Sequence, residues 1–193
     1  MFKLIIFGLA LWVITGFNPT KGVDFEDKIL HKELQKISGM EKPDWREVLV
    51  TEAQKASCTI EGKFLVLSGL TTNEPNKYIY VGRVNSCRQG GCSNPSHEAI
   101  GETSEYFDYL IVFDSNASVQ QVKVYNYQAT HGQEVTNKGW LKQFQGYNGN
   151  RSLTVGKNID AISGATVSVY SITDDIQEKT KLLKKILHGH RTT

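Results

Sequence analysis

The order of the apolar segments limits the folds open to this chain, because strand-like runs fill its middle and a long helical repeat closes it. Four runs rich in β-branched and aromatic residues have the composition of strands, at residues 64–67, 78–81, 109–113 and 119–127. Asp114, Ser115 and Asn116 form a turn signal between the last two runs and predict a hairpin. Strands followed by helices favour an α+β fold in which an antiparallel sheet packs against helices.

Four other segments have helical spacing. Apolar residues recur through residues 24–39 and stop at Gly39, and shorter helices are expected over residues 44–53 and 136–145. The longest repeat has its apolar positions at Val167, Tyr170, Ile176, Leu183 and Leu187. We therefore expect a long C-terminal helix to cover the sheet.

The start of this last helix has the composition of an anion site. Asp160 is followed by Ser163, Gly164, Ala165 and Thr166, with Ser163 as the expected N-cap and Thr166 in the first turn. The first amides of a helix are unpaired and the helix dipole is positive there, so a phosphate gains hydrogen bonds and a favourable field. On spacing alone, a capped helix that holds no ligand is the simpler interpretation.

A longer match changes that balance. Residues 160–168 resemble the flavinylation motif of the FMN-binding domain family, Asp-x-x-Ser/Thr-Gly-Ala-Thr, whose members include the C subunit of the sodium-pumping NADH:quinone oxidoreductase and the G subunit of the Rnf complex. A second matching pattern lies about twenty residues upstream, at Gly132, Gly139, Trp140, Leu141, Phe144 and Gly146. Together the two patterns extend the resemblance over roughly residues 78–187 and imply the same α+β fold.

The resemblance also implies roles for individual residues. Thr166 would carry FMN through a phosphoester bond that a separate flavin transferase installs, and Asp160 would serve recognition by that transferase. Ser163, Gly164 and Ala165 would shape the phosphate nest. The candidate neighbours of the flavin ring are Trp140, Tyr125 and Tyr127. Taken singly, each of these aromatic residues is expected to be part of the apolar core rather than a flavin contact. Of the three, we prefer Trp140 as the flavin contact.

One departure from the family pattern concerns the turn before the tryptophan segment. Many members have Glu-Thr-Pro-Gly there, whereas this chain has Ala129, Thr130, His131 and Gly132. Only Thr130 and Gly132 match in kind. His131 either takes the place of the family glutamate or is a solvated turn residue.

The N-terminus has the pattern of an exported protein. Lys3 precedes an apolar run that ends near Phe17, which is shorter than the about 20 residues that cross a bilayer as a helix. We expect residues 1–22 to be a signal peptide, with an uncleaved membrane anchor as the alternative. Residues 23–57 would then be a helical extension and residues 58–193 the FMN-binding domain, facing the periplasm or the extracytoplasmic side of the membrane.

Two other features of the composition bear on partners. The formal net charge of +2 is too small to argue for nucleic acid. Four lysines near the C-terminus are interpreted as a solvated helix face: Lys179, Lys181, Lys184 and Lys185.

The three cysteines leave two interpretations open. A local disulfide between Cys87 and Cys92 is favoured and leaves Cys58 unpaired. The alternative is a metal site built from Cys58, Cys87, Cys92 and His97. We assign no metal ligands.

These observations together predict an exported flavoprotein electron carrier with covalent FMN on Thr166. It would be matured by a flavin transferase and would relay electrons between a membrane redox complex and an extracytoplasmic acceptor. One alternative is a flavin-dependent reductase acting on a small substrate, although the chain has no dinucleotide-binding fingerprint. Another is a degenerate binding module that holds no flavin.

Overall fold

The sheet is a five-stranded antiparallel meander in which every strand pairs with its neighbours in sequence. The computed structural model describes residues 22–55, 58–67, 76–86 and 105–189. Within these ranges the strands are β1 (Trp45–Glu47), β2 (Gly62–Leu67), β3 (Lys77–Asn85), β4 (Tyr106–Phe113) and β5 (Val119–Tyr127). The predicted antiparallel α+β fold is confirmed, and all four predicted strands are present.

The predicted hairpin joins β4 to β5. Asp114 accepts hydrogen bonds at its Oδ1 from the backbone amides of Asn116 and Ser118, both at 2.9 Å. The amide of Ala117 donates to the carbonyl oxygen of Asp114, and Ala117 has a φ of 59°. The Asp side chain therefore closes the turn, as expected of this residue type.

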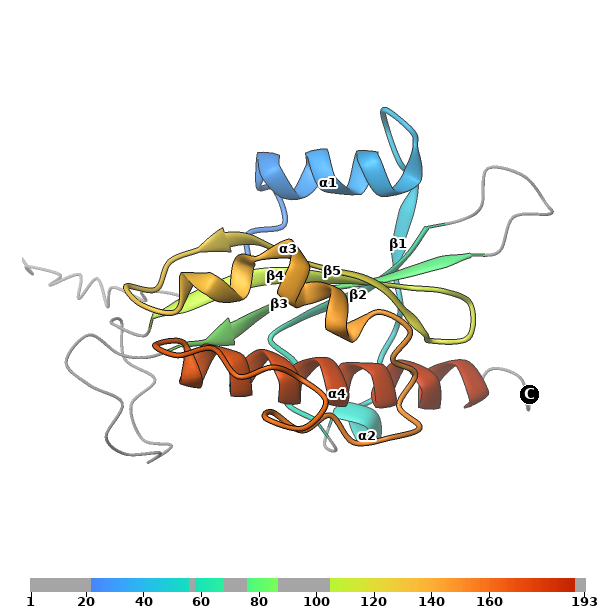
Figure 1. Cartoon of the computed structure of the whole chain (residues 1–193). Coiled ribbons are helices and arrows are strands. Elements are labelled where there is room, and N and C mark those ends of the chain that lie inside the picture. Colours follow the sequence, from blue (N-terminus) through green and yellow to red (C-terminus); the bar gives the residue numbers. More distant parts are fainter. Residues whose placement is uncertain (1–21, 56–57, 68–75, 87–104, 190–193) are drawn as a thin grey trace, which may run out of the picture.

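Helices cover both faces of the sheet (Figure 1). Helix α1 (Lys28–Ser38) lies on one face and α4 (Thr166–Gly189) on the other. The helix expected over residues 136–145 is confirmed in part, because it is divided into η1 (Gln133–Thr136), α3 (Lys138–Leu141) and η2 (Lys142–Phe144). These short helices pack into the same core as α4.

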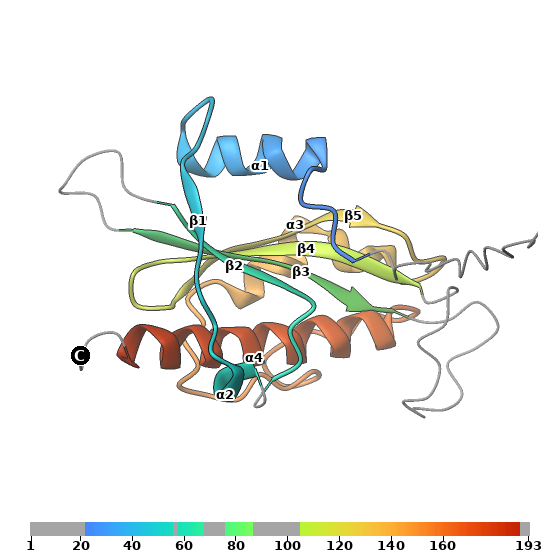
Figure 2. The same cartoon turned by 180° about the vertical axis from the view of Figure 1, so that it is seen from behind.

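The prediction of a helix over residues 44–53 is wrong. Residues 45–47 form β1, which pairs with β2 through Trp45 and Leu67, and only the short helix α2 (Glu52–Lys55) follows. Trp45 packs against the apolar cluster beneath α1, so its burial and the strand pairing outweigh the local helical spacing. Figure 2 shows β1 at the edge of the sheet, running from the side of α1 toward α2.

Two apolar cores result from this layering. The larger lies between the sheet and α4, and the smaller lies between the sheet and α1. Alternate residues of β5 therefore face different cores: Val122 and Val124 face α4, and Tyr125 faces α1 with 9% of its surface exposed. Tyr125 is therefore buried, because α1 covers that face of β5.

Helix α1 is capped at both ends and bound to the sheet by a buried charge. Asp27 accepts hydrogen bonds from the amides of Ile29 and Leu30, and Gly39 ends the helix at a φ of 71°. Glu33 is 6% exposed, and its Oε1 lies 2.7 Å from the Nζ atoms of both Lys36 and Lys123. Because Lys123 belongs to β5, this pair connects α1 to the sheet.

Acid should weaken this connection. Burial alone would raise the pKa of Glu33, but hydrogen bonds and charge attraction from Lys123 and Lys36 outweigh it, so the pKa lies below its ordinary value of 4.5. A lowered pKa contributes stability above pH 4.5 that is lost as the pH falls through the pKa of the folded state. We expect Glu33→Gln to lower the free energy of unfolding by about 1.5–3 kcal/mol at neutral pH.

Urea unfolding of the wild type and Glu33→Gln, at neutral pH and near pH 3, measures this effect. The difference between the two proteins should shrink in acid. Glu47→Gln is the matched control, because the pair of Glu47 with Lys63 is half-exposed and should contribute little. A Glu33→Gln difference of the same size at both pH values would contradict the assignment.

Several sequence expectations fall outside the described residues. These are the signal peptide, Cys87, Cys92 and His97. Within the described ranges, no helix is long and apolar enough to cross a membrane. The predicted export and the predicted disulfide therefore stay predictions.

Candidate functional site

The start of α4 is formed by a tight turn. Gly164 has a φ of 82°, and the amide of Ala165 donates to the carbonyl oxygen of Ile162 at 3.2 Å. The first α-helical bond runs from the amide of Val169 to the carbonyl oxygen of Ala165, at 2.9 Å. Ala165 therefore occupies the N-cap position and Thr166 is the first helical residue.

The prediction of Ser163 as N-cap is wrong by two residues. A left-handed φ at Gly164 interrupts the helical backbone, so the helix cannot begin before Ala165. Ser163 lies in the preceding turn and is exposed. It remains close to the helix start in sequence, and its part in the phosphate nest stays a prediction.

The exposed groups at this helix start fit a phosphate ester. Thr166 is exposed, whereas the neighbouring Ala165 is buried and fixes the turn to the core. The amides of residues 166–168 precede the first helical bond, so they have no acceptor within the helix. A Cβ added at Gly164 would meet no atom within 4 Å, so the space beside the turn is open. A hydroxyl, unpaired amides and a positive helix end are the groups that an anionic ligand needs.

Two side chains from the α3 region hold Asp160, the first residue of the motif. The indole Nε1 of Trp140 donates to the carbonyl oxygen of Asp160 at 2.9 Å. The amide of Asp160 donates to Oε1 of Gln143 at 2.8 Å. Trp140 is 8% exposed and packs edge-on against Phe144, with ring centroids 5.3 Å apart. Trp140 thus holds the first residue of the motif in place through this hydrogen bond. Its contact with a flavin stays a prediction.

In the turn of residues 129–132, which departs from the family pattern, Thr130 is hydrogen-bonded to the carboxylate of Glu105, a residue outside the turn. Glu105 accepts one hydrogen bond from the amide of Thr130, at 3.0 Å, and another from the Thr130 hydroxyl. These bonds lower the pKa of Glu105. His131 is exposed, and its carbonyl oxygen accepts a hydrogen bond from the hydroxyl of Tyr127. The turn is therefore held by Glu105 and Tyr127 rather than by an acidic residue of its own.

Gly132 brings this turn against the first turn of α4. Its φ is 88°, and an added Cβ would lie 2.6 Å from Oγ of Ser168 and 3.4 Å from Cα of Ala165. Ser168 also lies within hydrogen-bond distance of Ser86 at the end of β3, with 2.6 Å between the hydroxyl oxygens. A larger residue at Gly132 would displace the Ser168 hydroxyl, and its backbone would be strained at a φ of 88°.

The three aromatic candidates occupy different places. Tyr125 faces α1, on the opposite side of the sheet from Thr166, so its predicted place beside the flavin ring is wrong. Tyr127 lies at the turn beside Gly132 and stacks on Phe107, with centroids 5.5 Å apart. Two contacts of the site are not indicated by the sequence patterns: that of Glu105, whose partner lies 25 residues away, and that of Gln143. No local pattern identifies either contact.

The comparison with known families agrees with this geometry. Residues 105–180 match the model of the FMN-binding domain family. This part of the chain is an FMN-binding domain. The match begins at Glu105 and includes β4, β5, the turn at Gly132 and the start of α4. This match supports FMN as the cofactor of the domain. No curated protein matches the chain.

The sheet continues beyond the matched residues. Strands β2 and β3 precede the match but belong to the same sheet, and β3 pairs with β4 from Tyr78 and Phe113 to Asn85 and Tyr106. The closer similarity to the C subunit of the sodium-pumping oxidoreductase and the G subunit of the Rnf complex stays a prediction.

A second group of charges lies farther along α4. Lys179 is fully buried, and its Nζ donates to Asp175 Oδ1 at 2.5 Å, to the carbonyl oxygen of Thr59 at 2.6 Å and to Sγ of Cys58 at 3.4 Å. Asp175 also accepts a hydrogen bond from the hydroxyl of Tyr109. Interpreting Lys179 as part of a solvated face is therefore wrong, because the ion pair offsets its burial.

Cys58 is a free thiol that is partly buried beside this group. Burial raises the pKa of Cys58, which keeps it a thiol. Across the described ranges, no three residues of the metal-binding types gather at one place. The metal alternative rests on Cys87, Cys92 and His97, which lie outside those ranges.

Proposed function

We propose that this protein is an exported flavoprotein electron carrier with FMN joined to Thr166 through a phosphoester bond. The observation that carries the proposal is the exposed hydroxyl of Thr166 at the first position of a 24-residue helix, inside a matched FMN-binding domain. The surrounding sequence, Asp160 to Thr166, supports the covalent form of binding because it resembles the flavinylation motif.

The residues of the chain serve to hold and orient the cofactor. The amides and hydroxyls at the start of α4 would hold the phosphate. The turn at Gly132, which Glu105 holds through Thr130, packs directly beside that helix start. FMN supplies the redox chemistry when bound. Among the described residues, no histidine or carboxylate is hydrogen-bonded to the Thr166 hydroxyl, so activation for attachment is assigned to a flavin transferase.

Two features support the relay role. One is the matched FMN-binding domain, whose cofactor would carry the electrons, and the other is the expected signal peptide. A phosphoester tether keeps the cofactor on the protein outside the cytoplasm, where free FMN is scarce. The donor would be a membrane redox complex and the acceptor an extracytoplasmic protein or compound. The runner-up is a flavin-dependent reductase acting on a small substrate.

Reduction kinetics separate these two functions. The flavin-loaded protein should be reduced rapidly by energised membranes of its source cell and slowly by soluble NADH or NADPH, because a carrier needs a docking partner and the sequence lacks a dinucleotide fingerprint. Anaerobic absorbance at the flavin band measures both rates. Steady turnover with a soluble donor and a small acceptor, without membranes, would favour the reductase instead.

A further inference from the structure

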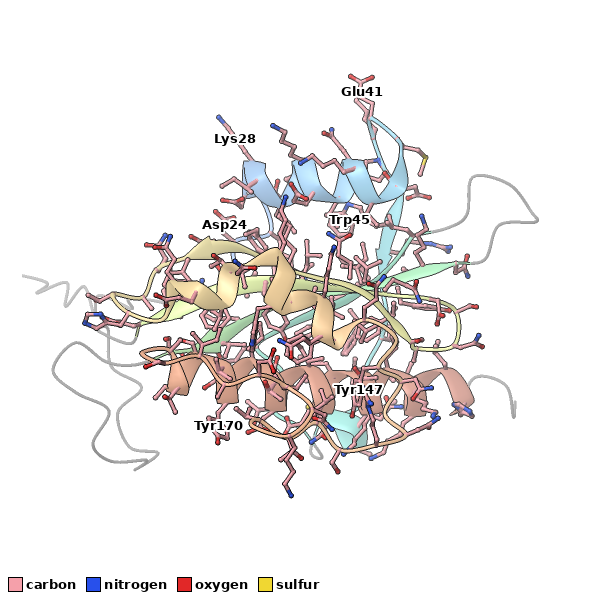
Figure 3. All side chains as sticks on the ribbon, in the orientation of Figure 1. Asp24, Lys28, Glu41, Trp45, Tyr147 and Tyr170 are labelled. Atoms are coloured by element: carbon pink, nitrogen blue, oxygen red, sulfur yellow. The ribbon has the colours of Figure 1, made fainter. Side chains whose placement is uncertain are left out.

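Tyr170 is an exposed aromatic residue one helical turn beyond Thr166. It is 49% exposed and lies on the side of α4 that faces away from the sheet (Figure 3). The sequence pattern placed Tyr170 on the apolar face of the helix, and this is wrong. The buried positions of α4 near it are Val169, Ile172 and Thr173.

This exposure is unusual within the described residues. The only other large apolar side chains with comparable exposure there are Ile29 on α1 and Leu49, both far from α4 in sequence. A half-exposed aromatic ring beside a binding site is open to contact with a ligand bound there. Tyr170 has no packing role in the core that would explain its identity.

The helix geometry sets Tyr170 close to the attachment point. Residues at positions i and i+4 lie on one helix face with Cβ atoms about 5–6 Å apart. Long side chains on a helix point toward its N-terminus and cover the turn before them. By this rule Tyr170 covers the turn that begins at Thr166, which is also exposed.

We propose that Tyr170 forms an aromatic platform for the isoalloxazine ring of the flavin joined to Thr166. This inference rests on the proposed function. Ring stacking would shield one face of the flavin from water and leave the other face open to a redox partner. The phenol is electron-rich, and aromatic rings in proteins favour offset stacking. Neither the family match nor the motif assigns this role to Tyr170.

Flavin fluorescence tests the contact, since a stacked tyrosine quenches the excited flavin by electron transfer. The proteins to compare are the wild type, Tyr170→Leu and Tyr170→Trp, each coexpressed with a flavin transferase. Asp174→Ala is the matched control, because Asp174 is exposed one turn farther along the same side of α4. Fluorescence is normalised to covalently bound flavin, determined by absorbance after denaturation.

We expect Tyr170→Leu to raise the fluorescence per flavin by about two- to tenfold, the range that corresponds to the stacking free energy of aromatic pairs. Tyr170→Trp should remain quenched, because indole both stacks and quenches, and Asp174→Ala should match the wild type. Equal fluorescence in the wild type and Tyr170→Leu, with flavin bound, would overturn the platform and leave the proposed function intact.

Two further results are also decisive. A lower flavin content in Tyr170→Leu with unchanged fluorescence per flavin would mean that Tyr170 contacts the transferase, and it would overturn the platform. A wild-type protein without covalent flavin, prepared with a transferase that is active on a control substrate, would overturn the proposed function and the platform together. The mass of the denatured protein distinguishes this second case.

Discussion

Thr166→Ala should abolish covalent flavin while the fold remains intact. The substitution removes the hydroxyl that would form the phosphoester bond, and no neighbouring residue can supply an oxygen at the same position of the helix. Thr166 is exposed, so its loss should change the free energy of unfolding by less than about 0.5 kcal/mol. Denaturing gel fluorescence after coexpression with a flavin transferase measures the covalent flavin, and urea unfolding measures the stability.

Ser163→Ala is the matched control for Thr166→Ala. It removes an exposed hydroxyl from the same motif but from the turn before the helix. Covalent flavin should survive this change, with at most slower attachment. Retention of covalent flavin in Thr166→Ala, or its complete loss only in Ser163→Ala, would show that the attachment site is not Thr166.

Lys179→Met should strongly destabilise the fold. It removes the cation that pairs with Asp175 and leaves that carboxylate in a partly buried place without its partner. Breaking a buried pair in this way costs about 3–5 kcal/mol. Burial alone would lower the pKa of Lys179, but the charge and hydrogen bond of Asp175 raise it, so the lysine stays charged at neutral pH.

Urea unfolding followed by far-ultraviolet circular dichroism measures this loss. Lys185→Met is the control, because Lys185 is exposed on the same helix and should change the stability by less than about 0.5 kcal/mol. Adding Asp175→Asn to Lys179→Met should recover part of the stability, since the uncompensated charge is then removed. Equal effects of Lys179→Met and Lys185→Met would refute the buried ion pair.

The strands were predictable because local composition decides them. Residues 109–113, for example, contain β-branched and aromatic side chains that suit a sheet covered on both faces. All five of these residues lie in β4. Helix α1 was predictable from its apolar spacing and from Gly39, which follows its last residue, although the expected start at residue 24 was four residues too early. Residues 45–47 were not predictable, because their structure depends on pairing with β2 and on the cover of α1.

The candidate site was predictable at its centre and not at its borders. The motif predicts Thr166 as the attachment site from sequence alone, and this stays a prediction. Glu105 and Thr130, by contrast, meet only because β4 and β5 pair. Lys179 has the same limit, since nothing in its own segment indicates that Thr59 and Cys58 lie beside it. Contacts between distant segments depend on the tertiary fold, and single-sequence patterns do not contain them.

Mass spectrometry tests the central claim most directly. The protein is coexpressed with an active flavin transferase, and its intact mass and the peptide of residues 158–179 are measured. The account predicts an added mass of FMN less one water, with fragment ions that place it on Thr166. An unmodified mass, or a flavin located on Ser163 or Ser168, would contradict the account.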